Sequence, residues 1–167
     1  MATVTEQLNQ PMQNGTTSDA GKRICFICTG NTCRSPMAAA IANALAKTDG
    51  LAISACSAGL YASAGAPISE HAVSALERAE IAPIDGMDYH AHTAQNLTAA
   101  LVAQSDWLIP MTPTHAMELM MRYPDAVKKI VCMPRPISDP FGGDLRVYEA
   151  CLSEITDGVR ALLRGEV

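Results

Sequence analysis

The stretch RICFICTGNTCRSPMAAA, residues 23–40, carries the strongest structural signal in the chain. Residues 23–28 contain a short apolar run of the kind that predicts a buried parallel strand. Residues 28–35 are mostly small or polar, which is typical of a tight loop. Ser35 is a favoured helix N-cap, and Pro36 suits the first helical position because an N–H there has no intrahelical partner. The stretch therefore predicts a strand, a tight loop and a helix in succession.

The rest of the chain alternates between strand-like and helix-like patterns in the same way. Apolar runs predict three further strands, at residues 51–58, 106–111 and 129–133. Apolar residues spaced three and four apart predict further helices, at residues 70–79, 96–104, 115–122 and 145–164. The alternation indicates an α/β fold: a single doubly wound domain with a four-stranded parallel sheet, flanked by helices on both faces in the flavodoxin-like manner.

The chain divides into a short leader and one domain. Residues 1–22 are polar and lack a periodic apolar face, which predicts a disordered N-terminal leader. The remaining residues, 23–167, are enough for one domain with its own core and too few for two ordinary ones.

Composition and charge narrow the classes of partner. The formal net charge is −5 and no basic stripe is present, so we expect no nucleic-acid partner. No apolar run approaches the length that spans a bilayer, so we expect no membrane partner. The six cysteines are scattered through the chain, which favours reduced thiols in the cytoplasm over a secreted disulfide scaffold. Cys28 and Cys33 lack a second Cys or His pair at ligand spacing, so we expect no metal and no cofactor.

The loop at residues 28–35 has the composition of an anion-binding site. Ligands of doubly wound sheets bind beyond the carboxyl ends of the strands, where this loop lies. Backbone amides of a strand-to-helix turn converge on a small anion, and the helix dipole strengthens their field. Gly30 and Asn31 tolerate the left-handed backbone that such a turn needs. We expect a phosphate group to bind to the loop residues Thr29, Gly30, Asn31, Thr32, Cys33 and Arg34.

Cys28 and Arg34 add a reaction to this loop. Arg34 enters the helix and can fold back, so that its planar guanidinium holds two phosphate oxygens. The same amides and guanidinium would stabilise a Cys28 thiolate, and a thiolate aimed at a phosphorus held by its oxygens is placed for in-line attack. The Cys–Arg spacing alone is a weak signal. The strand, the Gly-Asn interior, Ser35 and Pro36 around it make the whole string specific.

Residues 28–35, with the strand before them and Pro36–Met37 after them, resemble the signature of low-molecular-weight protein tyrosine phosphatases. The resemblance runs from Arg23 onward and includes Ser57-Ala58-Gly59 and Asp139-Pro140-Phe141-Gly142-Gly143. The leader lies outside it.

The resemblance implies a role for several residues. Cys28 would be the nucleophile, Arg34 would bind phosphate and stabilise the transition state, and Asp139 would be the general acid and later the general base. Ser35 would donate a hydrogen bond to the thiolate, which improves the thiolate as a leaving group when the cysteinyl-phosphate hydrolyses. The loop-supporting residues would be Asn31, Ser57 and His92.

Asp139 also fits a catalytic role without the resemblance. Asp-Pro before Phe-Gly-Gly predicts a loop, and an acid that protonates a leaving group needs freedom to approach it. A plain turn aspartate is the alternative. Phe141 and Tyr61 either wall the mouth of the site and influence specificity or serve in routine packing.

Cys33 is a second thiol in the loop. By resemblance, relatives with this cysteine trap the nucleophile as a reversible disulfide, which protects it from further oxidation. The alternative is a small residue that only lines the loop. The remaining histidines, His71, His90 and His115, carry no functional signal in the sequence.

Thr32 is the point at which the loop departs from the tyrosine-specific pattern, which usually has isoleucine there. The loop and residues 139–143 look more like bacterial protein arginine phosphatases. Isoleucine offers an apolar surface to an aromatic ring, whereas a threonine hydroxyl can pair with the N–H beside a phosphoramidate. Alternatively, Thr32 only stabilises the loop backbone. His92 favours the tyrosine phosphatases, because some arginine phosphatases lack a histidine there.

We therefore expect hydrolysis of phosphoarginine in proteins or peptides, with inorganic phosphate as the product and phosphotyrosine as the alternative substrate. An arsenate reductase is a remote alternative. It needs a closely spaced pair of further cysteines, whereas Cys56, Cys132 and Cys151 lie far apart in the sequence. A non-catalytic phosphate-binding module would not need both Cys28 and Asp139.

Overall fold

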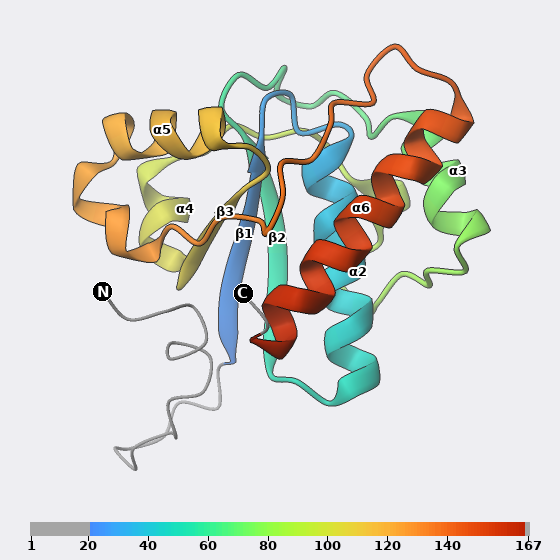
Figure 1. The fold of residues 1–167 in the computed structure, drawn as a ribbon, viewed down its shortest axis with the longest axis horizontal. Coiled ribbons are helices and arrows are strands. Elements are labelled where there is room, and N and C mark those ends of the chain that lie inside the picture. The colour runs from blue at the N-terminus through green and yellow to red at the C-terminus, as the bar shows by residue number, and fades with distance from the viewer. Residues whose placement is uncertain (1–20, 166–167) are drawn as a thin grey trace.

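A parallel sheet forms the centre of the computed structural model, which describes residues 21–165 (Figure 1). Its strands are β1 (Lys22–Cys28), β2 (Ile53–Gly59) and β3 (Trp107–Pro110), in the order β2-β1-β3. Both neighbours of β1 pair with it in parallel. This is the order of the first three strands in a flavodoxin-like sheet.

Helices cover both faces of the sheet, as the sequence predicts. They are α2 (Arg34–Asp49), α3 (Glu70–Arg78), α4 (Ala99–Gln104), α5 (Pro113–Arg122) and α6 (Leu145–Arg164), with short 3₁₀ turns at η1 (Tyr89–Ala91) and η2 (Pro124–Lys129). In Figure 1, α2, α3 and α6 lie on one side of the strands and α4 and α5 on the other. Alternate residues of β1 join the two cores: Ile24 and Phe26 pack with the first group, and Cys25 and Ile27 with the second. Burial of β1 on both faces explains its continuous apolar run.

The prediction of a fourth strand at residues 129–133 is wrong for the described chain. This segment makes a single parallel bridge between Leu108 and Ile130, and the Val131 N–H donates to the Leu108 carbonyl at 2.9 Å. The segment follows directly on η2 and is itself followed by Pro134 and Pro136. Because proline has no N–H to donate, the chain does not continue the ladder. The sheet within residues 21–165 therefore has three strands.

The predicted cap of the first helix is also wrong. Helix α2 begins at Arg34, its N-cap is Cys33, and no side chain caps it. The Ser35 hydroxyl lies 2.9 Å from Cys28 Sγ instead. Pro36 remains in the first turn of α2, where its missing N–H removes no intrahelical bond. The serine thus serves the loop rather than the helix.

The predicted leader, residues 1–22, falls almost wholly outside the described residues, since the description begins at residue 21. Strand β1 begins at Lys22, the last residue assigned to that leader. Among the described helices, none is both long and apolar enough to cross a bilayer.

Candidate active site

The loop between β1 and α2 surrounds a cavity at the carboxyl end of the sheet. The cavity has a volume of about 230 Å³. The residues that line it are Cys28, Thr29, Gly30, Asn31, Thr32, Cys33, Arg34, Asp139 and Phe141. The fold therefore brings the loop and Asp139 together, although they are far apart in the sequence.

Cys28 sits at the start of the loop with two donors aimed at its sulfur. The side chain is buried, with 3% of its surface exposed. Its Sγ lies 2.9 Å from Ser35 Oγ and accepts from the Asn31 N–H at 3.3 Å. Asn31 Nδ2 donates to Ser35 Oγ at 2.9 Å, so that oxygen is already an acceptor and its own hydrogen is free for the sulfur. The arrangement stabilises negative charge on Cys28.

Asn31 ties the loop to the rest of the domain. It is fully buried and has a φ of 57°, in the left-handed region that asparagine tolerates. Besides Ser35, its Nδ2 donates to Ser57 Oγ at 2.9 Å, and its Oδ1 accepts from the Gln95 N–H at 2.9 Å. His92 Nε2 lies 2.8 Å from the Asn31 carbonyl oxygen. The three predicted loop-supporting residues thus lie together. Gln95 joins them through its backbone N–H, which donates to Asn31, and its Nε2, which donates to the Ser57 carbonyl at 3.0 Å. No sequence pattern indicates either contact.

Arg34 reaches into the cavity from the first turn of α2. Its side chain is buried, and its Nη1 donates to the Ile137 carbonyl at 3.1 Å. Its Nη2 lies 3.6 Å from Asp139 Oδ2. Asp139 is more than half exposed, and its Oδ1 accepts from the Phe141 N–H at 3.1 Å. The carboxyl therefore stands at the mouth of the cavity, facing both the guanidinium and solvent.

The two aromatic side chains predicted at the mouth lie in different places. Phe141 is 79% exposed and lines the cavity. Tyr61 is exposed but is not one of the lining residues. Its hydroxyl donates to Glu118, and its ring lies 4.8 Å from the Arg122 guanidinium. A specificity role for either aromatic residue stays a prediction.

Thr32 and Cys33 occupy the middle of the loop. The Thr32 hydroxyl lies 3.7 Å from Cys33 Sγ. Cys33 is buried, and its Sγ lies 3.2 Å from the Tyr148 hydroxyl. Burial and the Cys33 contact raise the pKa of Tyr148 to about 12, so the phenol keeps its proton. All six cysteines are free thiols.

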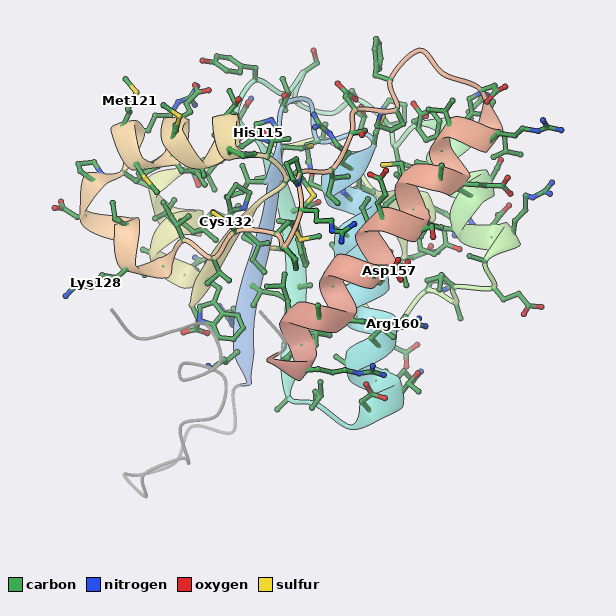
Figure 2. All side chains as sticks on the ribbon, viewed as in Figure 1. His115, Met121, Lys128, Cys132, Asp157 and Arg160 are labelled. Atoms are coloured by element: carbon green, nitrogen blue, oxygen red, sulfur yellow. The ribbon has the colours of Figure 1, made fainter. Side chains whose placement is uncertain are left out.

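His115, which carries no functional signal in the sequence, contacts the loop directly. Figure 2 shows it at the end of α5 that lies beside the loop after β1. The ring is buried, and its Nε2 lies 2.9 Å from Thr29 Oγ1. Its Nδ1 lies 2.9 Å from Thr112 Oγ1. The contact depends on how α5 packs against the sheet, so no local pattern reveals it.

Metal-binding side chains do not cluster in the part of the chain that the structure describes. Within residues 21–165, no three His, Cys, Asp or Glu side chains are placed to hold a metal ion together.

Comparison with known proteins assigns the family. The family model described as low molecular weight phosphotyrosine protein phosphatase matches residues 23–167. The chain belongs to this family. It is 32% identical over 148 residues to a protein-arginine-phosphatase of Bacillus subtilis (strain 168), covering 84% of this chain and 94% of that one. It is 33% identical over 144 residues to EpsP of Ralstonia nicotianae, a probable low molecular weight protein-tyrosine-phosphatase, covering 84% of this chain and 92% of the relative.

A solved structure matches the fold to a similar extent. It is a cysteine-to-serine variant of the arginine phosphatase YwlE with a phosphorylated active-site serine. The match has a TM-score of 0.78 and 31% identity, and covers 85% of this chain and 93% of that one. The protein is therefore a hydrolase of the low-molecular-weight phosphatase family, as the loop predicts. Arginine and tyrosine phosphatases are similarly close to it in sequence, so family membership is compatible with either substrate.

Proposed function

We propose that the protein hydrolyses phosphoarginine in proteins or peptides through a phosphoryl group carried by Cys28. The observation that most directly supports this proposal is the position of the Cys28 sulfur. It accepts two hydrogen bonds inside a loop whose cavity is also lined by Arg34 and Asp139. A nucleophile, an oxyanion-binding guanidinium and an acid in one small cavity are the parts that phosphoryl transfer requires.

In the first step the Cys28 thiolate attacks phosphorus, so that an S–P bond forms and the P–N bond to the arginine breaks. The electron pair of that bond stays on the nitrogen, which takes a proton from Asp139. Arg34 and the loop amides hold the phosphoryl oxygens as their charge redistributes. The 3.6 Å approach of Asp139 to Arg34 supports this assignment, because it places the acid beside the group that orients the phosphate.

In the second step a water molecule attacks the phosphorus of the cysteinyl-phosphate. Asp139, now a carboxylate, takes the proton of the water, the O–P bond forms, and the S–P bond breaks to release inorganic phosphate. The Ser35 hydroxyl, 2.9 Å from the sulfur, stabilises the departing thiolate. The phosphorylated active-site serine in the YwlE variant supports a phosphoryl group at the equivalent position of that enzyme.

Thr32 supports phosphoarginine as the substrate. It lines the cavity, and within residues 21–165 its hydroxyl has one hydrogen-bond partner, Cys33 Sγ at 3.7 Å. That long contact leaves the oxygen able to accept the N–H next to the transferred phosphoryl group. The alternative role for Thr32 is to stabilise the loop backbone. In that role its hydroxyl would already be hydrogen-bonded to the backbone.

Phosphotyrosine is the second candidate. Phe141 presents an exposed ring on the cavity wall, and a substrate phenol ring can pack against it. His92 also supports the Asn31 carbonyl, as expected for the tyrosine-specific members. Both candidates use the same cysteine chemistry and differ in the leaving group.

A competition between the two leaving groups tests the substrate. We expect the wild-type protein to give a higher kcat/KM on a phosphoarginine peptide than on the matched phosphotyrosine peptide. Thr32→Ile should shift that ratio towards phosphotyrosine by about tenfold or more, because an N–H is left without an acceptor. Thr32→Ser keeps the hydroxyl and serves as the control, so it should preserve the ratio. An unchanged ratio in Thr32→Ile would refute the choice of substrate.

The free thiols support a cytoplasmic location and a redox role for Cys33 as two further parts of the proposal. Cytoplasmic reductants keep cysteines reduced, and all six cysteines of this chain are free. Cys28 and Cys33 line the same cavity, which supports a reversible disulfide between them under oxidation. Mass spectrometry of peroxide-treated protein would locate that bond, and a Cys28 that oxidises without Cys33 would exclude it.

A further inference from the structure

Thr29, the residue after the nucleophile, is joined to α5 by a chain of side-chain hydrogen bonds. Thr29 Oγ1 lies 2.9 Å from His115 Nε2, and His115 Nδ1 lies 2.9 Å from Thr112 Oγ1. His115 is only 6% exposed, although histidine carries two polar nitrogens. Thr29 lines the phosphate cavity, so the chain ends at the place where a phosphoryl group would lie.

The local geometry favours one placement of the protons in this chain. Thr112 is the N-cap of α5, and its Oγ1 accepts the backbone N–H of His115 at 3.2 Å. With its oxygen already an acceptor, the Thr112 hydroxyl can donate its hydrogen to Nδ1. A neutral ring that accepts at Nδ1 carries its proton on Nε2 and donates it to Thr29 Oγ1. The Thr29 hydrogen is then directed away from His115.

Burial and the nearby charges together favour this neutral form. Burial lowers the pKa of His115, and the positive charge of Arg34, from the first turn of α2, lowers it further. Glu118 on α5 and Asp139 in the loop before α6 act in the opposite direction. The net shift is downward, so the ring stays neutral around pH 7.

We propose that His115 is a positioning residue, which holds the Thr29 hydroxyl so that this hydroxyl donates to an oxygen of the bound phosphoryl group. The inference rests on the proposed phosphatase reaction and adds a side-chain donor to the loop amides and Arg34. A phosphoryl oxygen only accepts hydrogen bonds, so a hydroxyl whose own oxygen is already engaged as an acceptor is oriented to serve it. The His115 nitrogen thereby acts on the substrate through Thr29.

A double-mutant cycle separates this role from simple packing of α5 on the loop. Thr29→Val removes the hydroxyl at nearly constant shape, and His115→Phe removes the ring nitrogens. Each should lower kcat/KM for a small aryl phosphate by about tenfold to a hundredfold, and the double variant should lose no more than either single variant. His115→Gln offers an amide N–H near the place of Nε2 and should recover most of the activity. Additive losses, full activity in His115→Phe, or no recovery in His115→Gln would overturn the inference.

The tautomer of His115 gives a readout that does not depend on turnover. Imidazole ¹⁵N spectra of the wild-type protein with saturating inorganic phosphate should show the proton on Nε2 and none on Nδ1. A proton on Nδ1 would overturn the inference, because Nε2 would then accept the Thr29 hydrogen. If the protein hydrolysed neither the phosphoarginine nor the phosphotyrosine peptide, the proposed function would fall, whereas this spectrum would still decide the placement of the Thr29 hydroxyl.

Discussion

Replacement of Asn31 by alanine should destabilise the domain and disable the loop together. The Asn31 side chain makes three hydrogen bonds, to Ser35, Ser57 and the Gln95 N–H, each of 2.9 Å. Its backbone has a φ of 57°, where a Cβ without a local polar group is strained. Asn31→Ala removes all three of these bonds and adds backbone strain, because alanine tolerates this conformation less well than asparagine.

The size of the effect follows from these contacts. A buried hydrogen bond contributes about 1 kcal/mol, so the three bonds account for about 3 kcal/mol. The left-handed backbone costs alanine about 1 kcal/mol more than asparagine or glycine. We therefore expect Asn31→Ala to lose about 4 kcal/mol of unfolding free energy, and Asn31→Gly to lose about 3 kcal/mol. For an m-value of about 2 kcal/mol/M, the urea midpoint of Asn31→Ala should fall by about 2 M.

Urea unfolding followed by tryptophan fluorescence measures this loss. Trp107 is the single tryptophan of the chain and is 8% exposed on β3, so its emission reports exposure of the core. The glycine variant is the matched control, because it separates the hydrogen bonds from the backbone strain. A midpoint for Asn31→Ala within about 0.3 M of the wild-type value would refute the reasoning, since the three bonds would then contribute nothing measurable.

Three other perturbations have definite expected outcomes. Asp139→Asn should slow substrates with poor leaving groups by about a hundredfold or more and good ones much less, because only the former need a proton; kcat across a series of aryl phosphates measures this. Gly59→Ala should lower both stability and kcat/KM, because its Cβ would lie 2.5 Å from a carbonyl oxygen of the phosphate-binding loop. Glu77 and, to a smaller extent, Asp88 raise the pKa of His90 above 6.5. The stabilisation that His90 adds relative to His90→Gln should be complete below about pH 6.5 and disappear as the pH rises through the raised folded pKa, as unfolding at several pH values would show.

These outcomes each have a control or a contrary result. Gly158→Ala is the control for Gly59→Ala: its Cβ would meet the terminal carbon of Met133, which can move aside, so loop and activity should be unaffected. Equal losses across leaving groups would argue against an acid at Asp139. A contribution of His90 to the free energy of unfolding that grows with pH would contradict this prediction, because Glu77 and Asp88 stabilise the protonated ring.

The sequence predicts the parts of the fold that depend on local patterns. The strand at residues 23–28 and the helix after it follow from an apolar run, small loop residues and periodic apolar positions, and the structure has both, with the strand beginning one residue earlier at Lys22. The helix at residues 145–164 is found with the predicted bounds. The strand expected at residues 129–133 has the right apolar content, but the segment follows directly on η2, makes one bridge to β3, and is followed by Pro134 and Pro136, which cannot extend the ladder. Non-local pairing is therefore where the pattern misleads.

In the candidate site, too, local patterns indicate some residues and miss those that come from distant segments. The loop residues are identifiable from the strand, the Gly-Asn interior and the Ser-Pro pair around them, and Asp139 from the loop signal of residues 139–143 and the resemblance. The structure places them around one cavity. His115 and Gln95 touch the loop from distant segments, one through a buried ring and the other through a backbone amide. The sequence around His115 and Gln95 has no pattern that predicts either contact. For Ser35 the local pattern predicts a helix cap, whereas the resemblance implies a hydrogen bond to the Cys28 sulfur. The structure has the second contact and not the first.

Capture of the phosphorylated enzyme tests the reaction most directly. The wild-type protein should be mixed with excess phosphoarginine peptide, quenched within one turnover, digested and mapped by mass spectrometry. We expect a phosphoryl group on the peptide that contains Cys28, and neither that group nor turnover in Cys28→Ala. A phosphoryl group on a different side chain, or hydrolysis by Cys28→Ala at the wild-type rate, would contradict a thiolate nucleophile in this loop.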